Sequence, residues 1–123
     1  MKDISIDFDG TLELIEVQDY VQTLMNRNDV RVWVTTRRFG NKPGRNNNDL
    51  YKVTRKLGIP NDRITFCNFK WKFEEISDKK FIFHLDDDSV DLDLLDRGSN
   101  HKIKCIQYTK NGNWRGYCEK FLK

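Results

Sequence analysis

The stretch ISIDFDGT, residues 4–11, leads from an apolar strand directly into two carboxylates and a glycine. Unpaired negative charge is costly at a buried or half-buried strand end, so Asp7 and Asp9 there are expected to face a cation, a donor network or a substrate. Gly10 lets the backbone turn sharply beside them. An acidic turn after an edge strand would fit this stretch equally well, so the choice depends on the rest of the chain.

Polar residues follow two further predicted strands. The β-branched run at residues 30–34 leads into Thr35, Thr36 and two arginines, and the apolar run at residues 81–85 leads into three aspartates. The carboxyl ends of parallel strands meet at one edge of a sheet, where ligands bind at a switch in strand order. We therefore expect one site that joins all three strand ends.

Apolar runs and helical spacing alternate along the whole chain. Gly58 and Gly98 are expected to end helices, and Ser89 to cap the start of one. This alternation predicts an α/β protein, with a three-layer Rossmann-like fold, a five-stranded parallel sheet and no cap domain. The expected strands are 4–6, 30–34, 64–67, 81–85 and 103–106, and the expected helices are 16–27, 50–57, 73–76, 89–95 and 116–123.

Length and composition predict one globular domain with a single core. The chain has 123 residues, of which 33% are charged, 37% hydrophobic and 12% aromatic. No apolar run is long enough to cross a bilayer, and the first residues lack the apolar core of a signal peptide. We therefore expect a cytoplasmic protein without membrane contact, as a monomer or a small homo-oligomer.

Cysteine spacing and net charge bear on disulfides, zinc sites and nucleic-acid binding. Cys67, Cys105 and Cys118 show no CxxC spacing, which argues against a disulfide framework or a zinc knuckle. The net charge of +3 is too small to indicate nucleic-acid binding by itself.

The predicted site offers several carboxylates, which would repel one another without a counter-ion. Oxygen ligands of this kind favour Mg²⁺ over Zn²⁺.

These motifs resemble those of the haloacid dehalogenase-like phosphohydrolase superfamily. Its first motif, DxDGT after a strand, is matched at residues 7–11, its second, a Thr or Ser ending the next strand, by Thr35, and its fourth, an acidic pair, by Asp86 and Asp87. Asp88 extends that pair and leaves the metal register open by one residue. The lysine of the third motif has several candidates, in the order Lys72, Lys70, and then Lys79 or Lys80.

The resemblance implies a phosphatase that works through an aspartyl-phosphate. Asp7 would attack phosphorus, and Asp9 would protonate the leaving oxygen and later activate water. Thr35 would hold the phosphoryl group, and Lys72 would offset its charge. Mg²⁺ would be held by Asp7, the backbone carbonyl of Asp9, Asp86 and Asp87. Thr11 and Thr36 are further candidates for substrate binding.

The substrate class follows from the missing cap and a basic loop. Neither insertion point of a family cap has room for more than a loop and a helix, and uncapped sites suit large or extended substrates. The loop after Thr35 carries Arg37, Arg38, Lys42 and Arg45, which would grip flanking phosphates. With the helix at 50–57 it resembles, more loosely, the phosphatase domain of polynucleotide kinase-phosphatases. A nucleic-acid 3′-phosphate or a nucleotide is therefore the leading substrate.

Other functions stay open at this level. A phosphoprotein or a small metabolite could be the substrate instead. A signalling receiver domain has similar length and residue types, although its acidic pair follows the first strand. A non-catalytic phosphate-binding module and a metal-dependent nuclease also fit an acidic rim. Among the neighbouring residues, we expect His84 to lie in the core and Asp91 to support the helix start.

Overall fold

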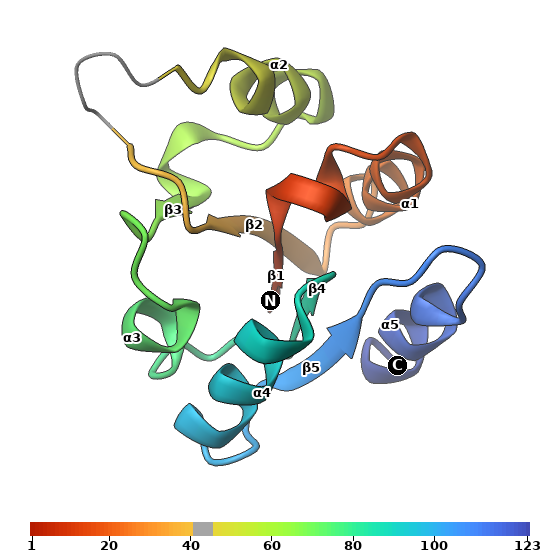
Figure 1. The fold of residues 1–123 in the computed structure, drawn as a ribbon. Helices are drawn as coiled ribbons and strands as arrows, with labels where there is room; N and C mark the ends of the chain where they lie inside the picture. Colours follow the sequence, from red (N-terminus) through yellow and green to blue (C-terminus); the bar gives the residue numbers. More distant parts are fainter. Residues whose placement is uncertain (41–45) are drawn as a thin grey trace.

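The computed structural model describes residues 1–40 and 46–123. In these residues five parallel strands form one sheet, in the order β3-β2-β1-β4-β5 (Figure 1). The predicted α/β class and parallel sheet are thus confirmed, with strand ends displaced by one or two residues from the expected positions. The strands are β1 (Lys2–Ile6), β2 (Val30–Thr36), β3 (Ile64–Phe66), β4 (Phe83–Asp86) and β5 (Lys104–Gln107).

Helices cover both faces of the sheet and complete three layers. One face packs against α1, α2 and α5, and the other packs against α3 and α4 (Figure 1). Each helix follows a strand, as the alternating pattern predicts. The helices are α1 (Ile15–Met25), α2 (Asn48–Leu57), α3 (Lys72–Ile76), α4 (Ser89–Gly98) and α5 (Trp114–Phe121).

The two faces of the sheet differ in chemistry. Ile4 and Ile6 of β1 are fully buried in the large core beneath α1, α2 and α5. Ser5 lies between them in sequence, so its side chain points to the opposite face, where it contacts His84 of β4. The smaller core under α3 and α4 contains Ile76, Phe81, Leu95 and Ile103. On the same face, Ser5 and His84 form a polar row beneath α3 and α4 that leads toward the carboxyl ends of the strands.

The strand order places a topological switch point between β1 and β4. From β1 the chain proceeds outward to β2 and β3, then crosses to β4 and β5 on the other side. In open α/β sheets ligands bind at the carboxyl ends of strands beside such a switch. Receiver domains have the order 2-1-3-4-5, so this sheet also argues against the receiver alternative.

Helix ends follow the expected chemistry at one position and differ at another. Gly58 ends α2 in the left-handed conformation, with φ 84°, as predicted. Ser89 was expected to cap α4, and this prediction is wrong. Asp88 is the capping residue, and its carboxylate accepts hydrogen bonds from the N–H groups of Val90 and Asp91. A carboxylate at this position also interacts favourably with the helix dipole.

The connections near the rim are short. Between β1 and β2 the chain forms a tight turn, Phe8–Leu12, and α1. Between β2 and β3 the described residues form α2 and the short turn Asn61–Arg63. Neither connection contains a further domain within the described residues. Among those residues, no helix combines the length and the apolar character that a membrane span requires.

Candidate active site

Asp7 follows the last residue of β1 and stays tied to the sheet. Its N–H donates to the carbonyl of Leu85 at 2.9 Å, and its own carbonyl accepts from the N–H of Leu12 at 3.0 Å. The intervening turn needs Gly10, whose φ is 77°. A Cβ at Gly10 would also lie 2.2 Å from Oδ2 of Asp87. A glycine at this position therefore lets the backbone approach the carboxylate of Asp87, which directly follows β4.

Lys72 is the lysine that enters this site. It is the first residue of α3 and only 2% of its surface is exposed. Its Nζ donates to Oδ1 of Asp7 at 2.7 Å and to Oδ2 of Asp86 at 2.5 Å. Asp91 of α4 lies behind it, with Oδ2 at 3.4 Å from Nζ and Oδ1 accepting from the Lys72 backbone N–H at 3.2 Å. Three buried carboxylates thus surround one ammonium group.

Burial and charge set the protonation of this cluster. Burial raises the pKa of Asp7 well above its ordinary value, against the lowering effect of Lys72. Burial alone would lower the pKa of Lys72, but the charges of Asp7 and Asp86 raise it overall. The pKa of Asp86 is lowered because hydrogen bonds from His84 and Lys72 outweigh its burial. Lys72 and Asp86 are therefore a charged pair, and Asp7 is a carboxylate of raised basicity.

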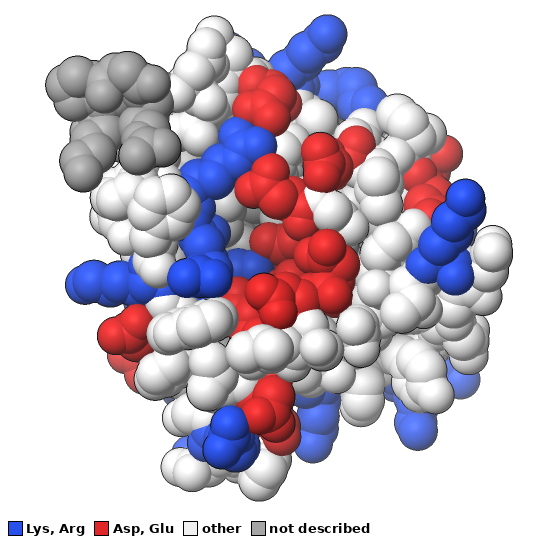
Figure 2. Space-filling model, viewed as in Figure 1, with Lys and Arg blue, Asp and Glu red and all other residues white. Residues whose placement is uncertain are grey.

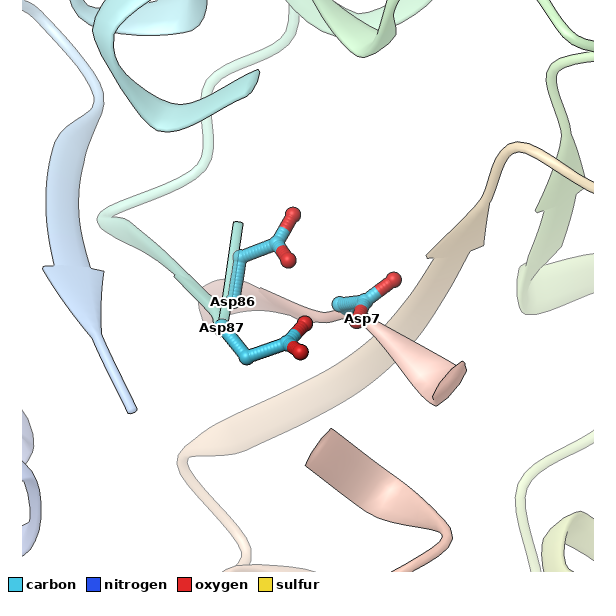
Figure 3. A group of neighbouring side chains, drawn as sticks. All are labelled: Asp7, Asp86 and Asp87. Carbon is cyan, nitrogen blue, oxygen red and sulfur yellow. The ribbon is translucent and has the colours of Figure 1, made fainter. Parts of the chain in front are cut away.

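Asp87 completes an acidic group at the end of β4. One carboxylate oxygen from each of Asp7, Asp86 and Asp87 lies within 4.8 Å of the other two. Asp86 and Asp87 point from β4 toward Asp7 (Figure 3). Burial, followed by the charge of Asp86, raises the pKa of Asp87. A bound cation would relieve this repulsion, and an all-oxygen ligand set suits Mg²⁺. The donor chemistry therefore fits the expected metal.

A buried hydrogen-bond chain links Asp86 to Thr35. His84 Nε2 lies 3.0 Å from Oδ2 of Asp86, Nδ1 lies 2.8 Å from Ser5 Oγ, and Ser5 Oγ lies 2.8 Å from Thr35 Oγ1. Burial lowers the pKa of His84, so the imidazole is neutral at neutral pH. Because ionised Asp86 only accepts, Nε2 donates to it and Nδ1 accepts from Ser5. Ser5 then accepts from Thr35, and the Thr35 hydroxyl proton points inward.

Asp9 takes part in a second, exposed ion cluster. Arg38 donates from Nη2 to Oδ1 of Asp9 at 2.7 Å and from Nε to Oδ2 at 3.0 Å. The same guanidinium donates to both oxygens of Asp49 in α2, at 2.7 and 2.8 Å. Asp9 therefore points toward α2 and does not join the acidic group of Asp7. Its backbone carbonyl as a metal ligand stays a prediction.

Arg37 is occupied with the neighbouring backbone. Its guanidinium donates to the carbonyls of Phe69 and Lys70, at 2.9 and 3.1 Å, and stacks over the ring of Trp71 at 4.2 Å. Thr36 is fully buried, and its hydroxyl accepts from the N–H of Arg38 at 3.2 Å. Both residues thus shape the turn after β2 in this structure, and their role toward a substrate stays a prediction.

Only some of the predicted site residues contact the acidic group. Thr11 joins the centre, since its hydroxyl donates to Oδ2 of Asp7 at 3.1 Å. Lys70 is 62% exposed in its side chain and pairs with Glu75 rather than with the acidic group. Lys42 and Arg45 lie outside the described residues. Acidic side chains gather at the centre of this face, with basic side chains along one side of them (Figure 2).

Two contributors escaped the sequence analysis. Asp49 was not singled out, although it shares Arg38 with Asp9. Ser5 was read as part of an apolar strand, yet it links His84 to Thr35. A polar residue between two buried isoleucines is a signal that could have found Ser5. Asp49 carries no such signal, because an acidic residue in the first turn of a helix is favourable in any case.

The chain matches no protein-family model, no curated protein and no solved structure. The likeness to the phosphohydrolase superfamily therefore rests on the motif residues of the sequence.

Proposed function

We propose that this protein is a Mg²⁺-dependent phosphomonoesterase of the haloacid dehalogenase-like type, with Asp7 as the nucleophile. The observation that supports this function most directly is the position of Lys72. Lys72 is only 2% exposed and lies between Asp7 and Asp86. Burying these charges costs desolvation free energy, so a functional role for the lysine is expected. A site that must stabilise a dianionic phosphoryl group beside a carboxylate supplies that role.

In the first step an oxygen of Asp7 forms a bond to phosphorus while the bond to the leaving oxygen breaks. Lys72 and Thr11 hold one carboxylate oxygen each, which fixes the orientation of the nucleophile. The raised pKa of Asp7 makes it a better nucleophile than an ordinary carboxylate while Lys72 favours its ionised form. The product of this step is an aspartyl-phosphate on Asp7.

Asp9 supplies the proton in the first step and removes one in the second. Its proton goes to the leaving oxygen as the ester bond breaks. Asp9 then takes a proton from the water that attacks phosphorus, and the bond from phosphorus to Asp7 breaks, which releases inorganic phosphate. The side chain is half exposed and paired with Arg38. Because the side chain is exposed, water can solvate Asp9 once it leaves Arg38.

The acidic group of Asp7, Asp86 and Asp87 would hold Mg²⁺, which neutralises phosphoryl charge when bound. His84 and Lys72 hold Asp86 in place for this role. Asp88 caps α4, which leaves Asp86 and Asp87 as the acidic pair at the end of β4.

The leading substrate remains a phosphate monoester on a nucleic-acid end or a nucleotide. The rim is open on the side of Asp87 and Asp9, both of which are exposed. The short connections beside the rim provide no lid within the described residues. An open site favours a large or extended substrate, whose own bulk helps to exclude water.

The test is Mg²⁺-dependent phosphate release from four substrates: a 3′-phosphorylated oligonucleotide, a 5′-phosphorylated one, a mononucleotide and an aryl phosphate. Asp7→Asn is the matched control, since the amide keeps the shape of the side chain and removes the nucleophile. We expect release by the wild type that EDTA abolishes and that falls to background in Asp7→Asn.

Each outcome separates one function from another. Preference for the 3′-phosphate supports end processing, whereas aryl phosphate turnover alone keeps the phosphatase and discards that substrate. Internal cleavage of the oligonucleotides would indicate a nuclease. No release from any substrate, or full activity of Asp7→Asn, would overturn the proposed mechanism.

A further inference from the structure

A groove of about 710 Å³ lies at the amino ends of β4 and β5, the end of the sheet opposite the acidic group. Its walls are the chain segments that join α3 to β4 and α4 to β5, together with Phe121 of α5. The two segments lie side by side because β4 and β5 pair, with Phe83 opposite Lys104. The volume falls in the range of about 300–1,000 Å³ that is typical of ligand sites.

Exposed lysines line this groove from both segments, Lys79 and Lys80 from the first and Lys102 and Lys104 from the second. Within the described part of the chain, none of these lysines forms an ion pair, and Asp78 is the only acidic residue that lines the groove. Like charges gathered in one groove repel one another, and a ligand with several negative groups relieves that repulsion. The groove therefore favours a polyanion.

The small net charge of +3 hides an uneven distribution of charge. Acidic side chains gather at the centre of the rim (Figure 2), whereas lysines dominate the groove at the other end of the sheet. A cleft lined by one sign of charge focuses the electric field and raises the local concentration of ions of opposite sign. The groove thus attracts a polyanion independently of any cation at the acidic group.

Backbone hydrogen bonds fix the two segments that carry these lysines. The N–H of Ile82 donates to the carbonyl of Asp3 at 2.8 Å, and the carbonyl of Ile82 accepts from the N–H of Lys104 at 3.1 Å. In the second segment, the N–H of Lys102 donates to the carbonyl of Ser99 at 3.1 Å. The positions of the lysines are therefore set before a ligand arrives, which lowers the entropic cost of binding.

A smaller hollow of about 200 Å³ adjoins the groove and shares Lys79, Lys80 and Phe81 with it. Half-buried Trp33 lines this hollow, with its ring centroid 5.9 Å from that of Phe81 and its Nε1 donating to Oδ1 of Asp3 at 2.8 Å. The hollow is smaller than a typical site for a whole ligand, so it suits one ring of a longer ligand. Aromatic rings beside a basic groove are the means by which proteins bind single strands.

We propose that the groove binds the sugar-phosphate backbone of a single-stranded nucleic acid, with one base in the hollow beside Trp33. An acidic peptide would match the lysines but would leave the aromatic hollow unused. The groove lies at the far end of the sheet from Asp7, so this inference does not rest on the proposed phosphatase activity. A strand bound there is held to the protein whatever reaction takes place at the rim.

The first experiment measures binding of a labelled oligothymidylate by fluorescence anisotropy in EDTA at several salt concentrations. The probe is about 10 nucleotides long, within the usual site size for single strands, and has hydroxyl groups at both ends. Neither a terminal phosphate nor Mg²⁺ enters the measurement. Each phosphate that a lysine neutralises contributes about −0.7 to the slope of log affinity against log salt concentration. We expect a wild-type slope of about −3, because both pairs of lysines contact phosphates.

Two double variants each remove the lysines of one segment. These are Lys79→Gln/Lys80→Gln and Lys102→Gln/Lys104→Gln. We expect each to bind more weakly than wild type and to make the salt slope shallower by about 1.4, because two phosphate contacts are lost. The lysines are exposed, so the variants should keep the wild-type midpoint of thermal unfolding.

Lys52→Gln/Lys110→Gln is the matched control, because it changes the net charge by the same amount at exposed lysines that line neither the groove nor the hollow. It should keep the wild-type slope. A probe of the same length without bases tests the hollow beside Trp33. We expect it to bind about tenfold more weakly to the wild type, because contact between one base and an aromatic ring is worth about that much.

The outcomes separate this inference from the proposed function. Absence of binding at low salt, an equal loss in the control variant, or equal affinity for the probe without bases would overturn the inference. A polyglutamate peptide of the same charge that binds as tightly as the oligonucleotide would overturn the assignment to nucleic acid. Aryl phosphate turnover without oligonucleotide binding would overturn the inference alone, and binding without any phosphate release would overturn the proposed function alone.

Discussion

Two ion clusters lie at the rim of the sheet, and each places one basic side chain between aspartates: three around Lys72 and two around Arg38. Lys72 bridges Asp7 and Asp86, with side-chain exposures of 3%, 8% and 1%. Arg38 bridges Asp9 and Asp49, with exposures of 24%, 53% and 59%. Both clusters pair a basic side chain with aspartates, and their shortest N–O distances fall in the same range. The difference lies in the solvent around each cluster.

Burial gives the two clusters different capacities. In the buried cluster, desolvation is severe, so removal of one partner leaves charge that cannot be solvated. In the exposed cluster, water can solvate a carboxylate that has lost its partner, so the loss of one pair costs less than in the buried cluster. A buried cluster therefore suits groups that must keep one geometry, and an exposed cluster suits a side chain that must move. This matches the roles proposed for Asp7 as a fixed nucleophile and for Asp9 as a mobile acid.

Lys72→Met should break the buried cluster with the largest effect. The change leaves Asp7, Asp86 and Asp91 without their ammonium group, and we expect a loss of about 3–5 kcal/mol in the free energy of unfolding at pH 8. The loss should be smaller at pH 5, because the raised pKa of Asp7 lets it take up a proton and lose its charge. Denaturant unfolding at both pH values measures this.

Lys70→Met is the matched control for Lys72→Met, because that lysine is exposed and pairs only with Glu75 in the described contacts. We expect its unfolding midpoint and phosphate release to stay near wild type. Equal loss in both variants would show that Lys72 has no special place in the site.

Asp9→Asn tests the exposed cluster, because we expect it to lower the rate of phosphate release without a matching change in the free energy of unfolding. Loss of a general acid and base costs about 10²–10⁴-fold in rate. Asp49→Asn removes the other partner of Arg38 but not the proton donor, so its rate should stay within a few fold of wild type. Steady-state phosphate release from both variants tests this. Equal slowing of both would assign Asp9 to the ion cluster alone.

Asp7→Asn should stabilise the protein in EDTA, in contrast to Lys72→Met. Burial raises the pKa of Asp7 above 3.8, so above about pH 4 the folded protein retains a proton that the unfolded chain releases. The stability contribution of this group then falls as pH rises. The asparagine variant lacks that loss, so its stability relative to wild type should rise from pH 5 to pH 8.

Asp93→Asn provides the control for this pH dependence, because Asp93 is 63% exposed in its side chain and pairs with Arg97 on the surface. Its stability relative to wild type should not change across the same range. A constant difference between Asp7→Asn and wild type at pH 5 and pH 8 would contradict the raised pKa of Asp7.

Arg38→Met should have the smallest effect on stability. Water can solvate Asp9 and Asp49 once the guanidinium is gone, so we expect the free energy of unfolding to change by no more than about 1 kcal/mol. Thermal unfolding of Arg38→Met beside Lys72→Met compares the two clusters directly. A loss as large as that of Lys72→Met would mean that exposure does not separate them.

Much of the fold was predictable because it follows from local patterns. Apolar runs with period two and helices with period 3.6 are visible in any window of the chain, and Gly58 ends α2 for a local backbone reason. The cap of α4 was missed because Ser89 and Asp88 are both good capping residues. Only the backbone direction after β4 decided between them, and Asp88 is the residue whose carboxylate reaches the free N–H groups.

By itself, the sequence determined the order of strands and helices and the placing of Asp7, Thr35 and Asp86 at carboxyl ends. Parallel pairing then brings those ends to one rim. The tertiary structure decided which basic residues belong to which acid. Lys72 and Lys70 look alike in sequence, as do Arg37 and Arg38, and only the turn into α3 and the turn after β2 aim one of each pair at an aspartate. Burial then separates the two clusters, because solvation depends on everything packed around a charge.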